Sequence, residues 1–403
     1  AESARRRKER GRQSVVRRPR EVGARGGYLS GLIDSVSNAL PFTKKGAVIL
    51  INGKPAVEGQ EGQACQEAML AVRFKGKIFE EDVEEGRYFL LVSYGDPWSQ
   101  RTLIAHGLAG LQGRVGVIAT DGIWPISKGL PAIATKGWRF SKGRKQDSKS
   151  TNRDPFNHVR LKSGTVYLHE LYSATDPRST GRVTIPALWD SKTGRIINNE
   201  SGEIVRILHQ NFRSLGVNGI DLYPDDLQEE IERIRQIVYK INAGVYKCGY
   251  AAREEAYRAA LIETFRAMDA CESVLKGRQF LAGDRITELD VMAFPTLIRF
   301  DVSYYPAFRC HIRRMRNYPN LTAYLERLYK IEAFRSTVHM PTYAIAHFIE
   351  TRWKGRTVGN ALRLLESMVD ICTGAALPGS GWWTRAVSRI ITLPARVLSC
   401  ISK

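Results

Sequence analysis

The sequence predicts an α/β domain followed by an all-helical domain. The apolar runs 88–92 and 115–119 have the continuous hydrophobicity of buried parallel strands, and the segment 97–111 between them has a helical pattern. From residue 221 onward, apolar residues recur with the helical period of about 3.6 residues. Strands that precede a long run of helices indicate two successive domains.

The remaining elements follow from local signals. Residues 184–189 and 195–198 read as a hairpin, and a helix over 201–212 closes the first half. In the second half one helical stripe comprises Leu227, Ile231, Ile234, Ile237 and Val238. Thr287 and Asp290 have the spacing of a capping box that opens a core helix.

These elements divide the chain into four parts. We expect a basic N-terminal extension, an α/β domain, a helical domain and a basic amphipathic C-terminal extension, with the respective bounds 1–69, 70–212, 213–345 and 346–403. The 403 residues and the apolar fraction of 43% suit a globular protein of two domains with extensions.

The net charge of +20 is concentrated in three segments. Residues 1–45 carry +8, residues 136–162 carry +7 and residues 351–403 carry +6, whereas the rest of the chain nets −1. Such basic segments attract phosphate or anionic lipid. We therefore expect a large organellar complex as partner, with RNA or an anionic membrane surface as the target of these segments.

The first 26 residues are Arg-rich and poor in acidic residues, which is typical of organelle transit peptides. We expect a mitochondrial protein, with a plastid as the alternative. A solvated tail without a targeting role accounts for the same composition equally well. The six cysteines are scattered with no CxxC pair, so the sequence predicts neither a metal site nor a disulfide framework.

Short motifs between residues 70 and 345 occur in the order and spacing of one known family. They include Phe74-Lys-Gly-Lys77, Pro97-Trp98, Gly181-Arg-Val-Thr-Ile-Pro-Ala-Leu-Trp-Asp190, Asn198-Asn-Glu-Ser201, Gly244-Val-Tyr-Lys247 and Phe280-Leu-Ala-Gly-Asp284. In these motifs the chain resembles the Xi class of glutathione transferases, the glutathionyl-hydroquinone reductases. The resemblance implies the glutathione transferase fold, in which a thioredoxin-like domain precedes the helical domain, and it allows a homodimer.

The resemblance also implies a binding site. Glutathione would contact Trp138, Ile185, Pro186, Glu200 and Ser201. Ser201 equally suits a plain N-cap role at its helix start. The acceptor pocket would include Tyr246 and Tyr304, although both tyrosines and Trp138 could serve in packing alone.

The catalytic position departs from the family. Relatives carry a cysteine directly before Pro-Trp, and this chain has Asp96 there. A carboxylate caps a helix but cannot exchange thiols, and we expect the helix N-terminus to lower its pKa and make it a poor base. Ser99 is a weak substitute, Ser93 is another hydroxyl nearby, and Cys248 reads as an ordinary half-buried thiol.

Three functions fit these observations. The first is a catalytically degenerate transferase that serves as a structural subunit of a ribosome or a membrane energy complex. The second is an active glutathione-dependent transferase or reductase for quinone-type substrates, which uses Ser99 or bound glutathione itself. The third is a glutathione sensor without turnover. The sequence favours the first.

Overall fold

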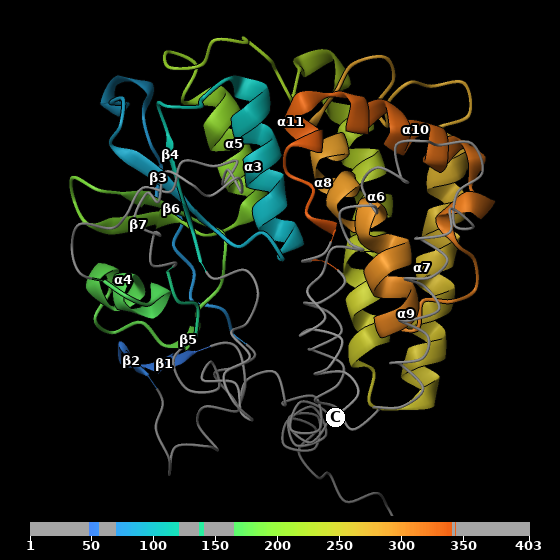
Figure 1. Cartoon of the computed structure of the whole chain (residues 1–403), viewed down its shortest axis with the longest axis horizontal. Coiled ribbons are helices and arrows are strands. Elements are labelled where there is room, and N and C mark those ends of the chain that lie inside the picture. Colours follow the sequence, from blue (N-terminus) through green and yellow to red (C-terminus); the bar gives the residue numbers. More distant parts are fainter. Residues whose placement is uncertain (1–47, 56–69, 121–136, 141–164, 341–342, 344–403) are drawn as a thin grey trace, which may run out of the picture.

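The computed structural model describes two domains side by side (Figure 1). The described residues are 48–55, 70–120, 137–140, 165–340 and 343. The basic segments 1–45 and 351–403, and 136–162 apart from 137–140, lie outside them.

A four-stranded sheet forms the centre of the first domain. Its order is β4-β3-β6-β7, with β3 and β4 parallel and the other pairs antiparallel. The bounds are Tyr88–Val92 for β3, Gly116–Ala119 for β4, Ala187–Asp190 for β6 and Arg195–Asn198 for β7. The strands predicted from apolar continuity are therefore confirmed.

Helices cover both faces of this sheet. Helices α3 (Pro97–Ala109) and α5 (Ser201–Gln210) pack on one face, together with the helical domain, while α4 (Leu168–Thr175) packs on the other (Figure 1). Alternate residues of β3 show the division, because Leu90 faces α3 and α5 whereas Leu91 faces α4. Helix α3 ends at Gly110, which has a left-handed conformation (φ 70°) and closes the helix early.

A small second sheet was not predicted. Strands β1 (Ile49–Ile51) and β2 (Lys54–Pro55) pair with each other, and β1 also pairs with β5 (Gly181–Arg182). Residues 49–55 fall within the predicted N-terminal extension 1–69, because strands of two or three residues show no periodicity that would indicate them. Their pairing with β5 makes them part of the α/β domain, which thus begins before residue 70.

Long helices form the second domain. They are α6 (Gln228–Tyr250), α7 (Glu254–Val274), α8 (Glu288–Arg299) and α10 (Pro319–Lys330). The short elements of this domain are η3 (Asp225–Leu227), the π-helical turn η4 (Phe300–Tyr304), α9 (Tyr305–Ala307), η5 (Met315–Asn317) and α11 (Glu332–Arg335), and η1 (Glu80–Asp82) belongs to the first domain. The predicted capping box at the start of α8 is confirmed.

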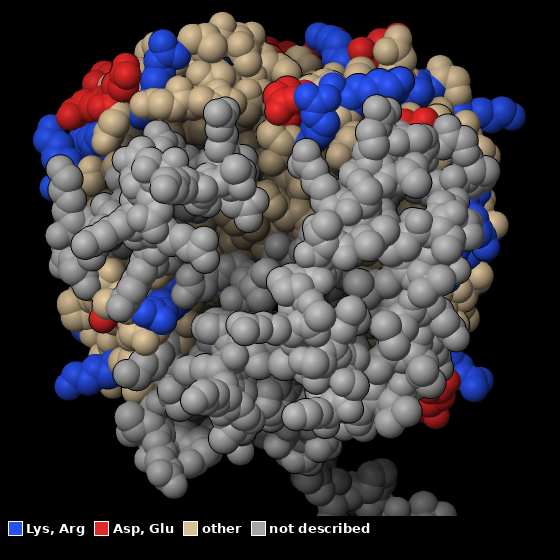
Figure 2. Space-filling view, in the orientation of Figure 1, with Lys and Arg blue, Asp and Glu red and all other residues tan. Residues whose placement is uncertain are grey.

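Within the described part of the chain, no helix combines the length and apolarity needed to cross a membrane, and no cluster of His, Cys, Asp and Glu could hold a metal ion. On the face of the molecule shown in Figure 2, lysine and arginine side chains are interspersed with acidic ones around the edge of the described residues. This mixture agrees with the near-zero net charge of the sequence outside the three basic segments.

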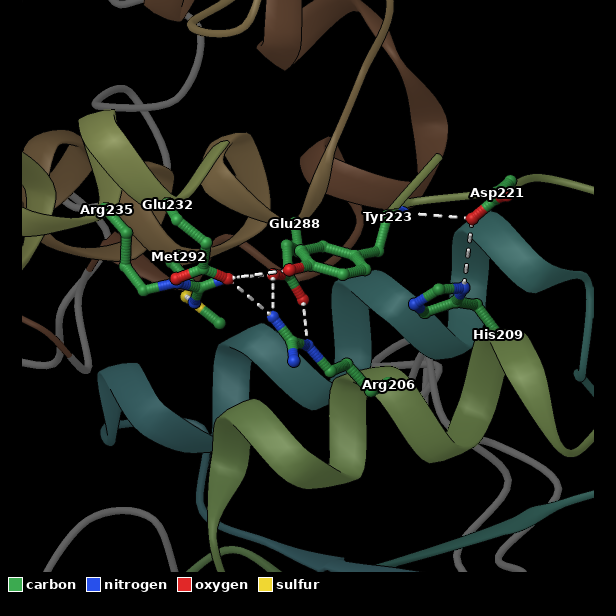
Figure 3. A network of polar contacts seen from close by, with 8 residues as sticks. All are labelled: Arg206, His209, Asp221, Tyr223, Glu232, Arg235, Glu288 and Met292. Atoms are coloured by element: carbon green, nitrogen blue, oxygen red, sulfur yellow. Dashed lines mark hydrogen bonds and ion pairs between the residues drawn. The ribbon is translucent and has the colours of Figure 1, made fainter. Parts of the chain in front are cut away.

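An ion-pair network joins the two domains (Figure 3). Glu288 at the start of α8 is fully buried, and its two oxygens accept hydrogen bonds from Arg206 of α5 at 2.9 and 2.7 Å. Arg235 of α6 binds the same carboxylate. One apolar core also runs through both domains, so the domains form a single packed unit.

We predict that Glu288→Gln destabilises the fold. The change leaves two arginines without their buried counter-charge, although both remain partly hydrated. We expect a loss of about 2–3 kcal/mol in the free energy of unfolding, measured by denaturant titration. Glu255→Gln on the exposed side of α7 is the control and should change the free energy of unfolding by less than about 0.5 kcal/mol. Equal effects of the two variants would contradict the role of this network.

Candidate functional site at the start of helix α3

Helix α3 begins with a complete capping arrangement. Asp96 is the N-cap, Pro97 occupies the first helical position, and the backbone N–H of Ser99 donates to Asp96 Oδ2 at 2.6 Å. The Ser99 hydroxyl is fully buried and accepts the N–H of Ser93 at 3.1 Å. Both serines thus serve the turn into the helix, and this geometry gives no support to Ser99 as a substitute catalyst.

The expected low pKa of Asp96 is wrong. Burial raises the pKa of this carboxyl to about 6, although the Ser99 hydrogen bonds and the charges of Arg299 and Arg101 act to lower it. The helical domain packs over the helix start and removes part of the water around the half-buried carboxyl, and this loss of hydration outweighs the favourable helix terminus. Asp96 is therefore able to exchange a proton near neutral pH.

Two buried arginines lie near Asp96. Arg101 of α3 is 6% exposed, its guanidinium stacks 4.0 Å above the Trp98 ring, and its Nη1 donates a long hydrogen bond of 3.4 Å to Ser201 Oγ. Arg299 at the end of α8 is fully buried, binds Gln100 and the Pro295 carbonyl, and stacks on Tyr343. Loss of hydration lowers the pKa of Arg101 to about 10, while the Asp96 and Glu200 carboxylates favour its charged form.

Aromatic side chains from both domains meet beside these charges. The Trp98 ring of α3 stacks on Tyr246 of α6 at 6.3 Å, and the Tyr246 and Tyr304 hydroxyls are 3.3 Å apart. Phe308 packs against both tyrosines. Tyr246 is half-buried whereas Tyr304 is fully buried, and burial raises the pKa of Tyr304 to about 12. The structure thus brings together the two predicted acceptor residues, with Tyr246 as the more accessible.

Of the predicted glutathione contacts, Ser201 touches α3 through Arg101, while Ile185, Pro186 and Glu200 lie at the starts of β6 and α5. The Ile185–Pro186 peptide bond is cis and directly precedes β6. Glu200 is the N-cap of α5, so Ser201 occupies the first helical position instead of the cap, and its hydroxyl is the one that Arg101 contacts. The Glu200 carboxylate pairs with Arg73.

A buried amide holds this side of the site together. Asn199 donates to the Val72 carbonyl at 2.7 Å and to the Tyr172 hydroxyl at 2.9 Å, and it accepts the Phe74 N–H at 2.9 Å. The segment before β3 and the start of α5 are thereby fixed to each other. Trp138 lies apart from α3, half-buried on the α4 side of the sheet, where it packs against the buried cluster that includes Leu168 and Leu171 of α4.

Among the described residues no thiol lies at the start of α3. Cys248 is fully buried in α6, not half-buried as expected, and its sulfur lies 3.9 Å from the Thr264 hydroxyl of α7. The Cys310 thiol beside it lowers the pKa of Cys248, whereas burial raises that of Cys271 to about 12. All three described cysteines belong to the helical core.

Sequence reasoning missed three charged residues of this site. Arg101 follows Trp98 by three positions, the spacing at which helical neighbours touch, so its place on that ring was open to prediction. Arg299 stands in the sequence Arg299-Phe-Asp301, which matches the family, but its position beside α3 could not be predicted because it is distant in sequence. The pairing of Arg73 with Glu200 likewise depends on tertiary structure.

The chain is similar to known glutathione transferases. Residues 254–327 match the family described as Glutathione S-transferase, C-terminal domain. Glutathionyl-hydroquinone reductase PcpF of Sphingobium chlorophenolicum is 39% identical over 266 residues, which cover 66% of this chain and 78% of the relative.

Solved structures agree with these sequence matches. The Xi class transferase of Natrialba magadii superposes with a TM-score of 0.66 at 32% identity, covering 76% of this chain and 90% of the other. The glutathione-bound structure of YqjG from Escherichia coli K-12 gives 0.63 at 29% identity, covering 75% and 91%. The glutathione transferase fold is therefore confirmed.

We predict a pH-dependent gain of stability for Asp96→Asn. Because the pKa of the folded-state carboxyl is about 6 against an ordinary 3.8, the unfolded chain releases this proton first as the pH rises. Ionisation of Asp96 therefore lowers the free energy of unfolding. This destabilisation is absent at low pH, where the carboxyl is protonated in both states, and reaches its full size above about pH 6. Relative to wild type, Asp96→Asn should gain on the order of 2 kcal/mol between about pH 4.5 and pH 8.

Denaturant titrations across this pH range provide the measurement, and Asp284→Asn, at an exposed carboxyl, is the matched control. An advantage of Asp96→Asn that stays constant with pH would show that Asp96 is not desolvated as described.

Proposed function

The chain belongs to the Xi class of glutathione transferases, and we propose that it is a glutathione-dependent transferase for quinone-type acceptors in which bound glutathione supplies the reacting sulfur. The observation that carries this proposal is the arrangement at the start of α3. There the half-buried carboxyl of Asp96 lies near the buried guanidinium groups of Arg101 and Arg299. The stacked rings of Trp98 and Tyr246, which we call the aromatic wall, lie beside them.

The residues around α3 suit a charged tripeptide. Glu200 offers a carboxylate to the amino group of glutathione, and Ser201 with the free N–H groups of the α5 N-terminus suits a carboxylate. Ile185 and Pro186 present backbone to an extended peptide before β6. A solved relative is described as glutathione-bound, which supports the same ligand here.

The aromatic wall suits a flat acceptor. Trp98 and Tyr246 present stacked rings from the two domains, and rings of this kind bind planar electron-poor molecules by offset stacking. The reductase names of the curated relatives point to hydroquinone derivatives as their substrates. We propose that this chain acts on the corresponding quinones, which are the electrophilic, oxidised forms of such compounds.

The reacting sulfur would come from the substrate, because none of the cysteines in the described part of the chain lies at the start of α3. Asp96 cannot form a mixed disulfide with glutathione, and the described cysteines lie in the helical core. The chain would therefore lack the protein-thiol step, and glutathione would attack the acceptor directly.

The role of a structural subunit remains a weaker proposal. It rests on the charge of residues 1–45, 136–162 and 351–403, nearly all of which lie outside the described residues. Mitochondrial location, RNA or membrane binding and a homodimer stay predictions. The relatives named above bear the names of enzymes, so we place the catalytic role first.

Two measurements on the purified chain test the proposal. Calorimetry should detect glutathione binding, and Ser201→Ala should weaken it about tenfold through loss of a hydrogen bond to a charged group. A substituted naphthoquinone should be converted to its glutathione conjugate faster than in the uncatalysed mixture. Ser214→Ala, at an exposed serine, is the control and should bind like wild type.

Mass spectrometry after incubation with a glutathionyl-hydroquinone distinguishes direct reaction of glutathione from a reaction through a mixed disulfide with a protein cysteine. We expect no glutathione adduct on wild type and one adduct on residue 96 of Asp96→Cys. Failure of wild type to bind millimolar glutathione, or an adduct on a wild-type cysteine during turnover, would overturn the proposal.

A further inference from the structure

The guanidinium of Arg101 has unused hydrogen-bonding capacity. Its side chain is more than nine-tenths buried, yet Nε has no partner and Nη1 makes only the 3.4 Å contact to Ser201. Buried cations are normally paired and fully hydrogen-bonded, because each lost bond to water costs free energy. The Nε–H of Arg101 is buried and has no hydrogen-bond partner, so it could donate to an anion that binds beside it.

Charges near the start of α3 do not balance. Arg101 and Arg299 contribute two positive charges, and Asp96 contributes one negative charge when ionised. Glu200 is already paired with Arg73. The site can therefore accept one further negative charge, and desolvation makes that charge more strongly stabilised than in water.

The position of Arg101 determines where this anion would lie. The Arg101 guanidinium stacks on Trp98, which is part of the aromatic wall proposed to bind the acceptor. It also contacts the hydroxyl of Ser201, which is one of the proposed glutathione contacts. Asp96 caps the same helix. Arg101 thus lies between the proposed glutathione contacts and the aromatic wall. The sulfur of glutathione would lie near Arg101 when it attacks the acceptor.

We propose that Asp96 and Arg101 together replace a catalytic cysteine: Asp96 accepts the thiol proton of bound glutathione, and Arg101 stabilises the thiolate that forms. This inference rests on the proposed function. The carboxyl oxygen that caps Ser99 leaves further lone pairs for the proton, and the cap holds the carboxyl in place.

The reaction balances without a further reagent. The S–H bond of glutathione breaks, its proton moves to an Asp96 oxygen, and the electron pair remains on sulfur. The thiolate then forms an S–C bond to a quinone ring carbon, and the pair displaced from the ring moves to a quinone oxygen. That oxygen takes the proton from Asp96, and the hydrogen of the attacked carbon moves to the second oxygen. The product is the glutathionyl-hydroquinone.

Several charged or titratable groups surround Asp96 and affect its ionisation. They are Arg101 on its own helix, Arg299 from α8 and Tyr304 from η4. His339 packs against the ring of Tyr94, two residues before Asp96 in the chain. Burial and Arg299 lower the pKa of His339 to about 4, so it stays neutral where Asp96 titrates. Arg101 and Tyr304 titrate well above neutrality. An acid limb of activity near pH 6 would therefore belong to Asp96.

The test compares Asp96→Asn, Arg101→Gln and Arg101→Lys with wild type in the naphthoquinone assay. Asp96→Asn keeps a capping side chain but cannot take a proton, so kcat should fall about 100-fold with a small change in KM for glutathione. Wild-type kcat should decline below about pH 6, and this limb should vanish in the variant. Arg101→Gln should lower kcat about 100-fold and shift activity to higher pH, and Arg101→Lys should recover part of the rate.

Arg266→Gln on the exposed side of α7 is the control and should keep the wild-type rate. If wild type turns over but Asp96→Asn retains both rate and acid limb, this inference is overturned while the proposed function stands. If wild type neither binds glutathione nor turns over, the proposed function itself fails. Should Arg101→Gln not fold, the pH profile of Asp96→Asn still decides.

Discussion

The burial of helix α3 on nearly all sides is the constraint on which the site depends. The helix packs against the sheet and α5 on one side and against α8 and α11 on the other, so eleven of its thirteen residues are buried. Charged groups at its start therefore lose water without leaving the reach of a substrate. This explains why a capping carboxylate, which would be strongly acidic on an exposed helix, holds its proton up to near neutrality.

The two domains contribute unequally to this environment. The α/β domain supplies Asp96, Trp98 and Arg101 from one helix, and the helical domain supplies the cover, with Tyr246 and the fully buried Arg299. The Glu288 network fixes the domains against each other at a distance from this site. A rigid interface allows the cover to remove water from Asp96 while the aromatic wall stays in register.

The sequence predicts the central strands and the helices well, because their apolar residues follow clear strand and helix patterns. The apolar run 88–92 and the residues 195–198 coincide with β3 and β7, and motif order gave the family before any geometry was known. Short strands such as β1 lacked periodicity and were missed. The pKa of Asp96 was predicted in the wrong direction, because sequence shows a cap residue but not what packs over it. Arg299 became visible only when the fold brought α8 to α3.

The ionisation state of bound glutathione tests the central claim most directly. Ultraviolet difference spectra of the complex report thiolate formation as the pH is varied. The account predicts that glutathione bound to wild type is ionised near neutral pH, well below the pH at which the free thiol ionises. Bound glutathione that keeps its proton up to the pH at which free glutathione loses it would contradict the account, because the charges at the start of α3 would then not act on the sulfur.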